Sequence, residues 1–300
     1  MIKPLSLKML AGRYAGTMPS GDCQFDAVST DTRRLKKNDL FIALKGPNYD
    51  AHDFLQSAID RGACGLVVEK PPRSIALPYW LVADTQTALA QIASLQRAYY
   101  RGRLVAVTGS TGKTTVKGLL SSILSAHSCR CGGTRDQVFA TEGNLNNHIG
   151  LPLSLLSLIP QHRFAVLEMG ASAMGEIDRL TDIAKPHVAV ITNVMPAHVE
   201  GFGSIAHIAR AKGEIFNGLS SNGTAVINKD DTFAEQWLRQ NKSRHCLTFT
   251  TVGAAAASQE SPNVWAENTV IDGRGRCRFR LCTDDDAIAC LLYTSDAADD

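Results

Sequence analysis

The sequence predicts an α/β protein, with a small N-terminal α/β domain followed by a doubly wound, mostly parallel sheet of the phosphate-loop ATPase type. Two observations carry this prediction. Continuously apolar segments alternate with helical patterns at residues 104–108, 164–168, 188–193 and 224–228, as expected of parallel strands that are covered on both faces. The first of these segments runs directly into a glycine-containing loop and then a helix, which is the arrangement of a phosphate-binding loop.

Composition limits the possible classes of protein. The chain has 300 residues, enough for two domains, and its 44% hydrophobic and 20% charged residues are typical of a globular protein. A net charge of +2 gives no reason to expect a nucleic-acid or membrane partner. No apolar run is long enough to span a bilayer and the N-terminus has no signal-peptide core, so we expect a cytoplasmic protein. The eight cysteines are scattered, and Cys129 and Cys131 lack a second pair at zinc spacing, which predicts free thiols.

The predicted division of the chain has four parts. Residues 1–84 form the small domain, 85–100 a linking helix, 101–290 the central nucleotide-binding domain, and 291–300 a tail unlike the rest. In the small domain we expect strands at 39–44 and 65–68. Between them, Asp53 is the expected N-cap of a helix that ends at Gly62. The expected core face of that helix is Phe54, Leu55, Ala58 and Ile59.

The phosphate loop is the most informative motif. It consists of Gly109, Ser110, Thr111, Gly112, Lys113, Thr114 and Thr115. Its glycines allow a close backbone approach, and the N–H groups at the helix start attract an anion, so ATP is the expected ligand. Lys113 would reach the outer phosphates and Thr114 would face Mg²⁺. The alternative is an ordinary strand–turn–helix, since Val107 stands where the usual motif has its first glycine. The helix should bury Val116, Leu119, Leu120, Ile123 and Leu124.

Two polar residues end predicted strands and should therefore point into the crevice that holds the nucleotide. Glu168 is a candidate second Mg²⁺ ligand beside Thr114, and Asn193 is a candidate nucleotide contact. The alternative for Glu168 is that it caps a helix that starts near Gly175.

Lys212 stands out because it lies among apolar residues on one face of a helix expected over residues 204–219, with Ser204 as N-cap. A buried ammonium is costly and its pKa falls, and such an amine can react with CO₂ to give a metal-binding carbamate. The alternative is that the side chain extends to the surface. His198 lies on a loop after the strand ending at Asn193, where a metal ligand would be useful.

Two polar turns complete the candidate residues. One contains Asn144, Asn146 and Asn147 before a leucine-rich helix. The other contains Ser29, Thr30, Asp31 and Arg33 beside a strand of the small domain. From composition alone, such clusters are expected to be turns and helix caps.

Taken together, these motifs resemble those of the Mur ligases. The resemblance rests on residues 108–115, 142–152, 168–170, 197–202 and 211–216, with 41–46 and 50–54 in the small domain, and covers roughly residues 25–230. It is greatest for the branch that adds D-alanyl-D-alanine. The branch that adds the third amino acid would have Asp where Ala197 precedes His198, and would lack the Asn144–Asn147 pattern.

The resemblance implies a ligase that uses ATP to add D-alanyl-D-alanine to UDP-N-acetylmuramoyl-tripeptide through an acyl phosphate, in peptidoglycan precursor synthesis. It implies that Lys113 stabilises the transferred phosphoryl group, that Thr114 and Glu168 hold one Mg²⁺, and that His198 and a carbamylated Lys212 hold a second. Asn144, Asn146 and Asn147 would contact the peptide substrate. Ser29, Thr30, Asp31 and Arg33 match a motif associated with its UDP end. We expect a monomer.

The resemblance also has gaps. The family's third, C-terminal domain is missing, and the family pattern fades beyond about Asn228. We therefore expect a truncated reading frame that is inactive alone. Four alternatives remain: the ligase that adds the third amino acid, a folylpolyglutamate synthetase, a phosphate-loop NTPase switch or kinase, and a fragment that only binds nucleotide.

Overall fold

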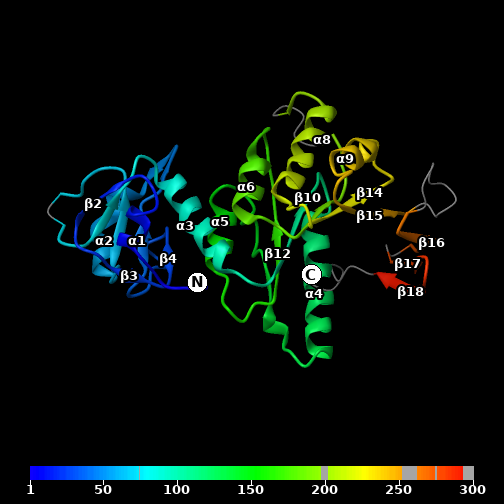
Figure 1. Ribbon diagram of the computed structural model, residues 1–300, viewed down its shortest axis with the longest axis horizontal. Coiled ribbons are helices and arrows are strands. Elements are labelled where there is room, and N and C mark those ends of the chain that lie inside the picture. Colours follow the sequence, from blue (N-terminus) through cyan, green and yellow to red (C-terminus); the bar gives the residue numbers. More distant parts are fainter. Residues whose placement is uncertain (74, 197–201, 252–261, 274–275, 293–300) are drawn as a thin grey trace.

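The computed structural model of the chain describes residues 1–73, 75–196, 202–251, 262–273 and 276–292. Figure 1 shows a small sheet domain at the N-terminal end, joined through one long helix to a larger sheet domain. This is the α/β class that the sequence predicts. The boundaries predicted at residues 84 and 100 stay a prediction. Within the described residues, no helix combines the length and apolar character needed to cross a bilayer.

The N-terminal sheet is mixed. Its strand order is β2 (Thr17–Ser20), β9 (Tyr79–Leu81), β8 (Gly65–Val68), β5 (Leu40–Ile42) and β4 (Val28–Ser29). Only β2 pairs in the antiparallel direction. Two short pairs flank the sheet, β1 (Leu5–Ser6) with β3 (Gln24–Phe25) and β6 (Lys45–Gly46) with β7 (Tyr49–Asp50). The helices are α1 (Leu7–Ala11), the 3₁₀ turn η1 (Ala51–Phe54) and α2 (Leu55–Asp60).

The helix predicted at Asp53 begins differently. Asp50 is the capping residue, and its carboxylate accepts a hydrogen bond from the His52 backbone N–H at 3.0 Å. A 3₁₀ turn therefore precedes α2, and this turn moves Phe54 off the core face. Phe54 is 41% exposed and stacks on Tyr49, with ring centroids 5.4 Å apart. The predictions that Asp53 is the cap and that Phe54 is a core residue were wrong.

The large sheet has its phosphate-loop strand near the middle. Its order is β11 (Val138–Ala140), β12 (Phe164–Glu168), β10 (Arg103–Thr108), β13 (Val188–Ile191), β14 (Thr224–Asn228), β15 (His245–Thr250), β16 (Val264–Ile271), β17 (Cys277–Cys282) and β18 (Ala287–Leu292). The strands from β11 to β16 are parallel, and β17 and β18 add an antiparallel edge. Because β12 and β13 lie on opposite sides of β10, the strand order reverses at β10. A ligand crevice is expected at such a reversal.

Helices cover both faces of this sheet. They are α3 (Thr85–Tyr99), α4 (Lys113–Arg130), η2 (Arg135–Gln137), α5 (Gly150–Leu156), α6 (Glu176–Ala184), α8 (Ile205–Gly213), η3 (Glu214–Gly218) and α9 (Ala234–Gln240). Alternate residues of β10 face opposite ways: Val107 packs towards α4, whereas Ala106 belongs to the core formed with α5, α6 and η3. The core between α4 and the sheet is small. Leu119 and Ile123 of α4 are 42% and 63% exposed rather than buried as predicted.

The linking helix predicted over residues 85–100 is α3, and Asp84 is its cap. Its buried residues join the apolar core of the small sheet to that of the large sheet, so one hydrophobic cluster runs through both. At the other end of the chain, β15–β18 continue the large sheet well beyond Asn228. Strand β18 also includes Leu291 and Leu292, the first two residues of the predicted tail; the others lie outside the described residues.

Candidate active site

The phosphate loop crosses the end of β10 and lies against the segment that follows β13. Gly109 has φ +152°, and a Cβ there would come within 1.9 Å of the Thr192 hydroxyl oxygen, so only glycine allows this approach. The Ser110 N–H donates to the Asn193 carbonyl at 2.9 Å, and the Thr111 N–H donates to Asn193 Oδ1 at 3.1 Å. Asn193 therefore braces the loop. Strand β13 ends at Ile191, two residues earlier than predicted.

The helix after the loop begins at Lys113, with Gly112 as its N-cap at φ +76°. The Lys113 ammonium donates to the Gly109 carbonyl at 2.9 Å and lies 3.5 Å from the Ser110 carbonyl. In the next position, the Thr114 hydroxyl donates to Glu168 Oε2 at 3.0 Å. Thr115 lies in the same first turn, and its side chain is exposed. The cationic Lys113 and the dipole of an 18-residue helix make this loop attractive to phosphate.

Glu168 is buried, with 3% of its surface exposed, and is the centre of a polar cluster. Besides the hydroxyl of Thr114, its carboxylate accepts a hydrogen bond from the Asn146 side-chain amide at 2.8 Å. Its alternative role as a helix cap is wrong. Glu214 occupies that position and accepts the backbone N–H groups of Gly175 and Asp178 at the start of α6.

Lys117 also belongs to this cluster and was missed from the sequence. It is 7% exposed, and its ammonium lies 3.6 Å from Glu168 Oε2 and donates to the Thr141 carbonyl at 2.8 Å. A signal was available: Lys117 follows Lys113 by four residues and so lies on the same helix face. Against that signal, a lysine on a helix is ordinarily solvent-exposed, and nothing in the sequence marks this one as buried.

The three asparagines of the turn before α5 have different positions. Asn147 Oδ1 accepts the backbone N–H groups of Ile149 and Gly150 and thereby caps α5. Asn146 contacts Glu168, as described above. Asn144 is exposed, and its carbonyl accepts the Asn146 N–H at 2.7 Å.

Lys212 is buried on α8, with 4% of its surface exposed, so the alternative of a side chain that extends to the surface is wrong. Its ammonium lies 5.9 Å from the centroid of the Phe202 ring and makes no hydrogen bond with any described residue. Burial, and then the positive charge of Lys113, lower the pKa of Lys212 to about 8. A sizeable fraction of this amine is therefore neutral, and nucleophilic, in mildly alkaline solution. The predicted His198 lies outside the described residues.

A cleft of about 600 Å³ brings several of these residues together. It is lined by the phosphate loop, the asparagine turn and the faces of α6 and α8, with contributions from Gly109, Ser110, Lys113, Asn146, Asn147, Arg179, Phe202 and Lys212. Lys113 and Lys212 therefore line one cleft, where an anionic ligand would offset their repulsion.

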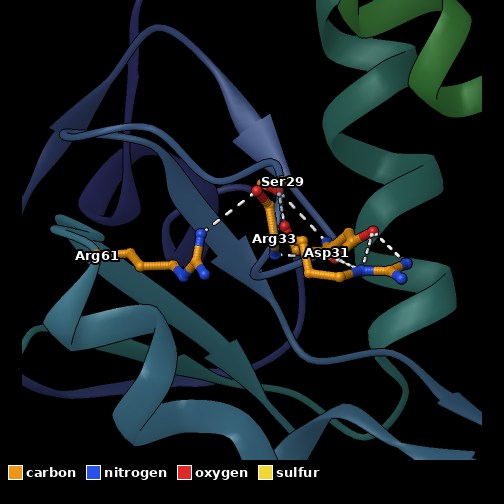
Figure 2. Close-up of polar contacts among 4 residues, drawn as sticks. All are labelled: Ser29, Asp31, Arg33 and Arg61. Atoms are coloured by element: carbon orange, nitrogen blue, oxygen red, sulfur yellow. Dashed lines mark hydrogen bonds and ion pairs between the residues drawn. The ribbon is translucent and has the colours of Figure 1, made fainter.

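The Ser29 cluster lies apart from this cleft, in the small domain. Figure 2 shows Asp31 between Ser29 and Arg33. The Ser29 hydroxyl donates to the Asp31 carbonyl at 2.9 Å, and Arg33 forms an ion pair with the Asp31 carboxylate at 2.8 Å. The hydrogen bonds to the Arg33 side chain lower the pKa of Asp31 to about 2. Arg61 donates to the Arg33 carbonyl at 3.3 Å, while Thr30 makes no side-chain hydrogen bond among the described residues. The contacts are those of a locally stabilised turn, and a role in substrate binding stays a prediction.

The oxygen donors of Thr114 and Glu168, beside the phosphate loop, suit Mg²⁺. A carboxylate and a hydroxyl at 3.0 Å from each other, beside a phosphate loop, are hard ligands of the type that this ion takes together with nucleotide phosphates. Among the described residues, no three His, Cys, Asp or Glu side chains are grouped as a metal site. A cation here would therefore depend on a nucleotide for its other ligands.

The fold and this cleft agree with the comparisons to known proteins. Residues 107–291, more than half of the chain, match the family model of the Mur ligase middle domain. The chain belongs to the Mur ligase family. The match corrects the expectation that the family pattern fades near residue 230, since it continues through the antiparallel edge of the large sheet.

Several named relatives are similar to this Mur ligase. It is 41% identical over 281 residues to a UDP-N-acetylmuramoyl-tripeptide–D-alanyl-D-alanine ligase of Haemophilus influenzae, covering 94% of this chain and 61% of the relative. It is 43% identical over 246 residues to the ligase of the same name from Escherichia coli, covering 82% and 52%. The chain therefore spans between about half and three fifths of the length of these two relatives.

Solved structures give the same grouping. MurF from Acinetobacter baumannii superposes with a TM-score of 0.84 at 32% identity, covering 97% of this chain and 61% of that one. MurF ligase from Thermotoga maritima in complex with ADP gives 0.74 at 30% identity, covering 88% and 57%. A UDP-N-acetylmuramoyl-L-alanyl-D-glutamate–2,6-diaminopimelate ligase shares the fold with a TM-score of 0.56 at 20% identity, covering 88% and 55%.

Proposed function

We propose that this Mur ligase chain binds ATP and UDP-N-acetylmuramoyl-tripeptide for the addition of D-alanyl-D-alanine to that peptide. The observation that carries the proposal is the cleft that Lys113 of the phosphate loop and Lys212 of α8 both line. A phosphate loop alone serves many NTPases, whereas a second, buried lysine with a lowered pKa offers an amine that can become a metal-binding carbamate beside the phosphates. The 41% identity over 94% of the chain supports the choice of substrate.

In this proposal the residues have separate tasks. Lys113 leaves the Gly109 carbonyl to bind the outer phosphates and stabilises charge as the phosphoryl group moves to the substrate carboxylate. Thr114 and Glu168 would hold Mg²⁺, which neutralises phosphate charge when bound. His198 is proposed as a ligand of a second Mg²⁺. Asn193 keeps the loop in place, as its hydrogen bonds to Thr111 indicate.

Lys212 is proposed to act as a carbamate. Its neutral amine attacks CO₂, a C–N bond forms and a proton is released, which turns a cation into an anion that can bind metal. Its lowered pKa supports this step, because only the free amine reacts. The resulting carboxylate would also relieve repulsion between Lys212 and Lys113.

The remaining assignments concern the substrate and the setting. We propose that Asn144, Asn146 and Asn147 contact the peptide part of the substrate, and that Ser29, Thr30, Asp31 and Arg33 contact its UDP end. We also propose a monomer in the cytoplasm. The cysteines, all free among the described residues, suit that reducing compartment.

The test is ligation itself. The chain is compared with a version extended by the part of the H. influenzae relative that lies beyond the matched region. With ATP, Mg²⁺, UDP-N-acetylmuramoyl-tripeptide and D-alanyl-D-alanine, the extended version is expected to form the pentapeptide product, measured by mass spectrometry. Phosphate release that does not depend on D-alanyl-D-alanine, with no product formed, would reject the proposal.

A further inference from the structure

Lys117 has no task in the proposed reaction, although it is buried nearly as completely as Glu168 and Lys212. It lies one turn after Lys113 on α4, and its ammonium is held by the Thr141 carbonyl and the Glu168 carboxylate instead of lining the cleft. Burying an ammonium group is unfavourable unless it is fully paired. An apolar side chain would fit the neighbouring core, where Val116 and Leu120 of the same helix pack against the sheet. The contacts of Lys117 must therefore account for its presence.

These contacts join three segments that are distant in sequence. The ammonium donates to the Thr141 carbonyl at 2.8 Å, lies 3.5 Å from the Gly143 carbonyl, and lies 3.6 Å from Glu168 Oε2. The same turn also contacts Glu168 directly, at two points. The Thr141 hydroxyl accepts the Glu168 backbone N–H at 3.0 Å, and the Asn146 amide donates to Oε1 at 2.8 Å.

Lys117 attaches the 141–147 turn to α4, and together with Thr114 it attaches the Glu168 carboxylate to that helix. Without its ammonium, the Glu168 carboxylate keeps Thr114 and Asn146 as partners but loses its nearby cation, and the carbonyls of Thr141 and Gly143 lose their donor. The carboxylate and the turn are then free to shift relative to the phosphate loop. Small shifts matter here, because a metal ligand must be held in place by its neighbours to bind well.

We propose that Lys117 is a positioning residue that holds the Glu168 carboxylate and the 141–147 turn in the arrangement that Mg²⁺-nucleotide binding requires. The inference rests on the proposed function, since it assumes that Glu168 serves a Mg²⁺-nucleotide. It concerns a residue that contacts neither nucleotide nor metal. Its effect should therefore show in the metal-dependent part of binding and not in the binding of nucleotide alone.

The test measures ATP affinity of the 300-residue chain by calorimetry, with Mg²⁺ and with EDTA. Lys117→Met removes the ammonium, Lys117→Arg keeps a cation, and Arg130→Met removes an exposed cation at the far end of the same helix. Lys117→Met is expected to lose about 10- to 100-fold of the Mg²⁺-dependent affinity while keeping metal-free binding. Lys117→Arg should recover part of the loss, and Arg130→Met should behave as the parent chain.

Thermal melting checks that each variant folds. Lys117→Gln, which keeps one donor for the Thr141 carbonyl, replaces Lys117→Met if the latter shows no cooperative melt. The inference is overturned if the folded variant keeps the full Mg²⁺-dependent gain, or if it loses metal-free and metal-dependent binding equally. Failure of the parent chain to bind ATP at all would instead count against the proposed function.

Discussion

The Thr114 hydroxyl donates a hydrogen bond of 3.0 Å to Oε2 of Glu168, which joins the first turn of the phosphate-loop helix to the end of the neighbouring strand β12. The two residues are far apart in sequence and meet because β10 and β12 are adjacent parallel strands. Since both are oxygen donors and lie beside a phosphate loop, the proposed function assigns Mg²⁺ to this pair of residues.

The first prediction concerns that bridge. Glu168→Gln removes the negative charge and keeps the shape, so ATP affinity in the presence of Mg²⁺ should fall at least about 10-fold. Affinity measured in EDTA should change little. Glu235→Gln, on the exposed side of α9, is the matched control and should leave both affinities unchanged. If Glu168→Gln and the parent chain bind ATP equally well in the presence of Mg²⁺, Glu168 is not a ligand of the metal.

The second prediction concerns the close approach at Gly109. Gly109→Ala places a methyl group 1.9 Å from the Thr192 hydroxyl oxygen at a φ that side chains rarely adopt. It should reduce the free energy of unfolding by about 1–3 kcal/mol and abolish ATP binding, because the loop must move. Gly112→Ala has open space around its Cβ, so only its left-handed φ costs free energy, and about 1 kcal/mol is expected. Urea titrations compare the two, and equal losses would argue against the steric explanation.

The third prediction concerns stability and pH. Lys212 is cationic at neutral pH in a buried site that lowers its pKa to about 8, so the folded protein is destabilised by its charge. Lys212→Met should therefore raise the free energy of unfolding by about 1–3 kcal/mol at pH 7.

The direction in which stability changes with pH depends on whether the folded or the unfolded chain holds the Lys212 proton more tightly. Between pH 8 and about 10.4 the unfolded chain holds more protons than the folded one, so the parent gains stability as pH rises. The advantage of Lys212→Met should shrink over that window and be constant below pH 8. Chemical denaturation of both proteins in CO₂-free buffer at several pH values measures this difference in the free energy of unfolding. An advantage independent of pH across this window would mean that Lys212 keeps an ordinary pKa.

The fourth prediction concerns the carbamate. In the extended version that carries the ligation assay, Lys212→Ala should lose activity, and added short carboxylates such as acetate should restore part of it by occupying the vacated space. With ¹³C-labelled bicarbonate, the parent chain should show a carbamate carbon signal by NMR that Lys212→Ala lacks. Full activity of the alanine variant would show that Lys212 is not needed.

Much of this site could be predicted because parallel sheets place strand ends together. Glu168 and the loop before α4 follow from that rule and from the phosphate-loop pattern. Lys212 was predictable because a lysine within an apolar helix face is unusual. For Lys117 the spacing from Lys113 was a weak signal, because its hydrogen-bond partners are backbone carbonyls of a turn that no periodic pattern positions. Asp50 competes with Asp53 as a cap, and only the 3₁₀ turn decides between them.

The most direct test of the central claim follows oxygen through the reaction. In a ligase that forms an acyl phosphate, a carboxylate oxygen attacks the γ-phosphorus of ATP and leaves with phosphate when the amine attacks the acyl carbon. The extended version is given UDP-N-acetylmuramoyl-tripeptide labelled with ¹⁸O in its terminal carboxylates, together with ATP, Mg²⁺ and D-alanyl-D-alanine. Mass spectrometry should find one ¹⁸O atom in each phosphate released with fully labelled substrate. Unlabelled phosphate, with its new oxygen taken from water, would identify an NTPase and contradict the account.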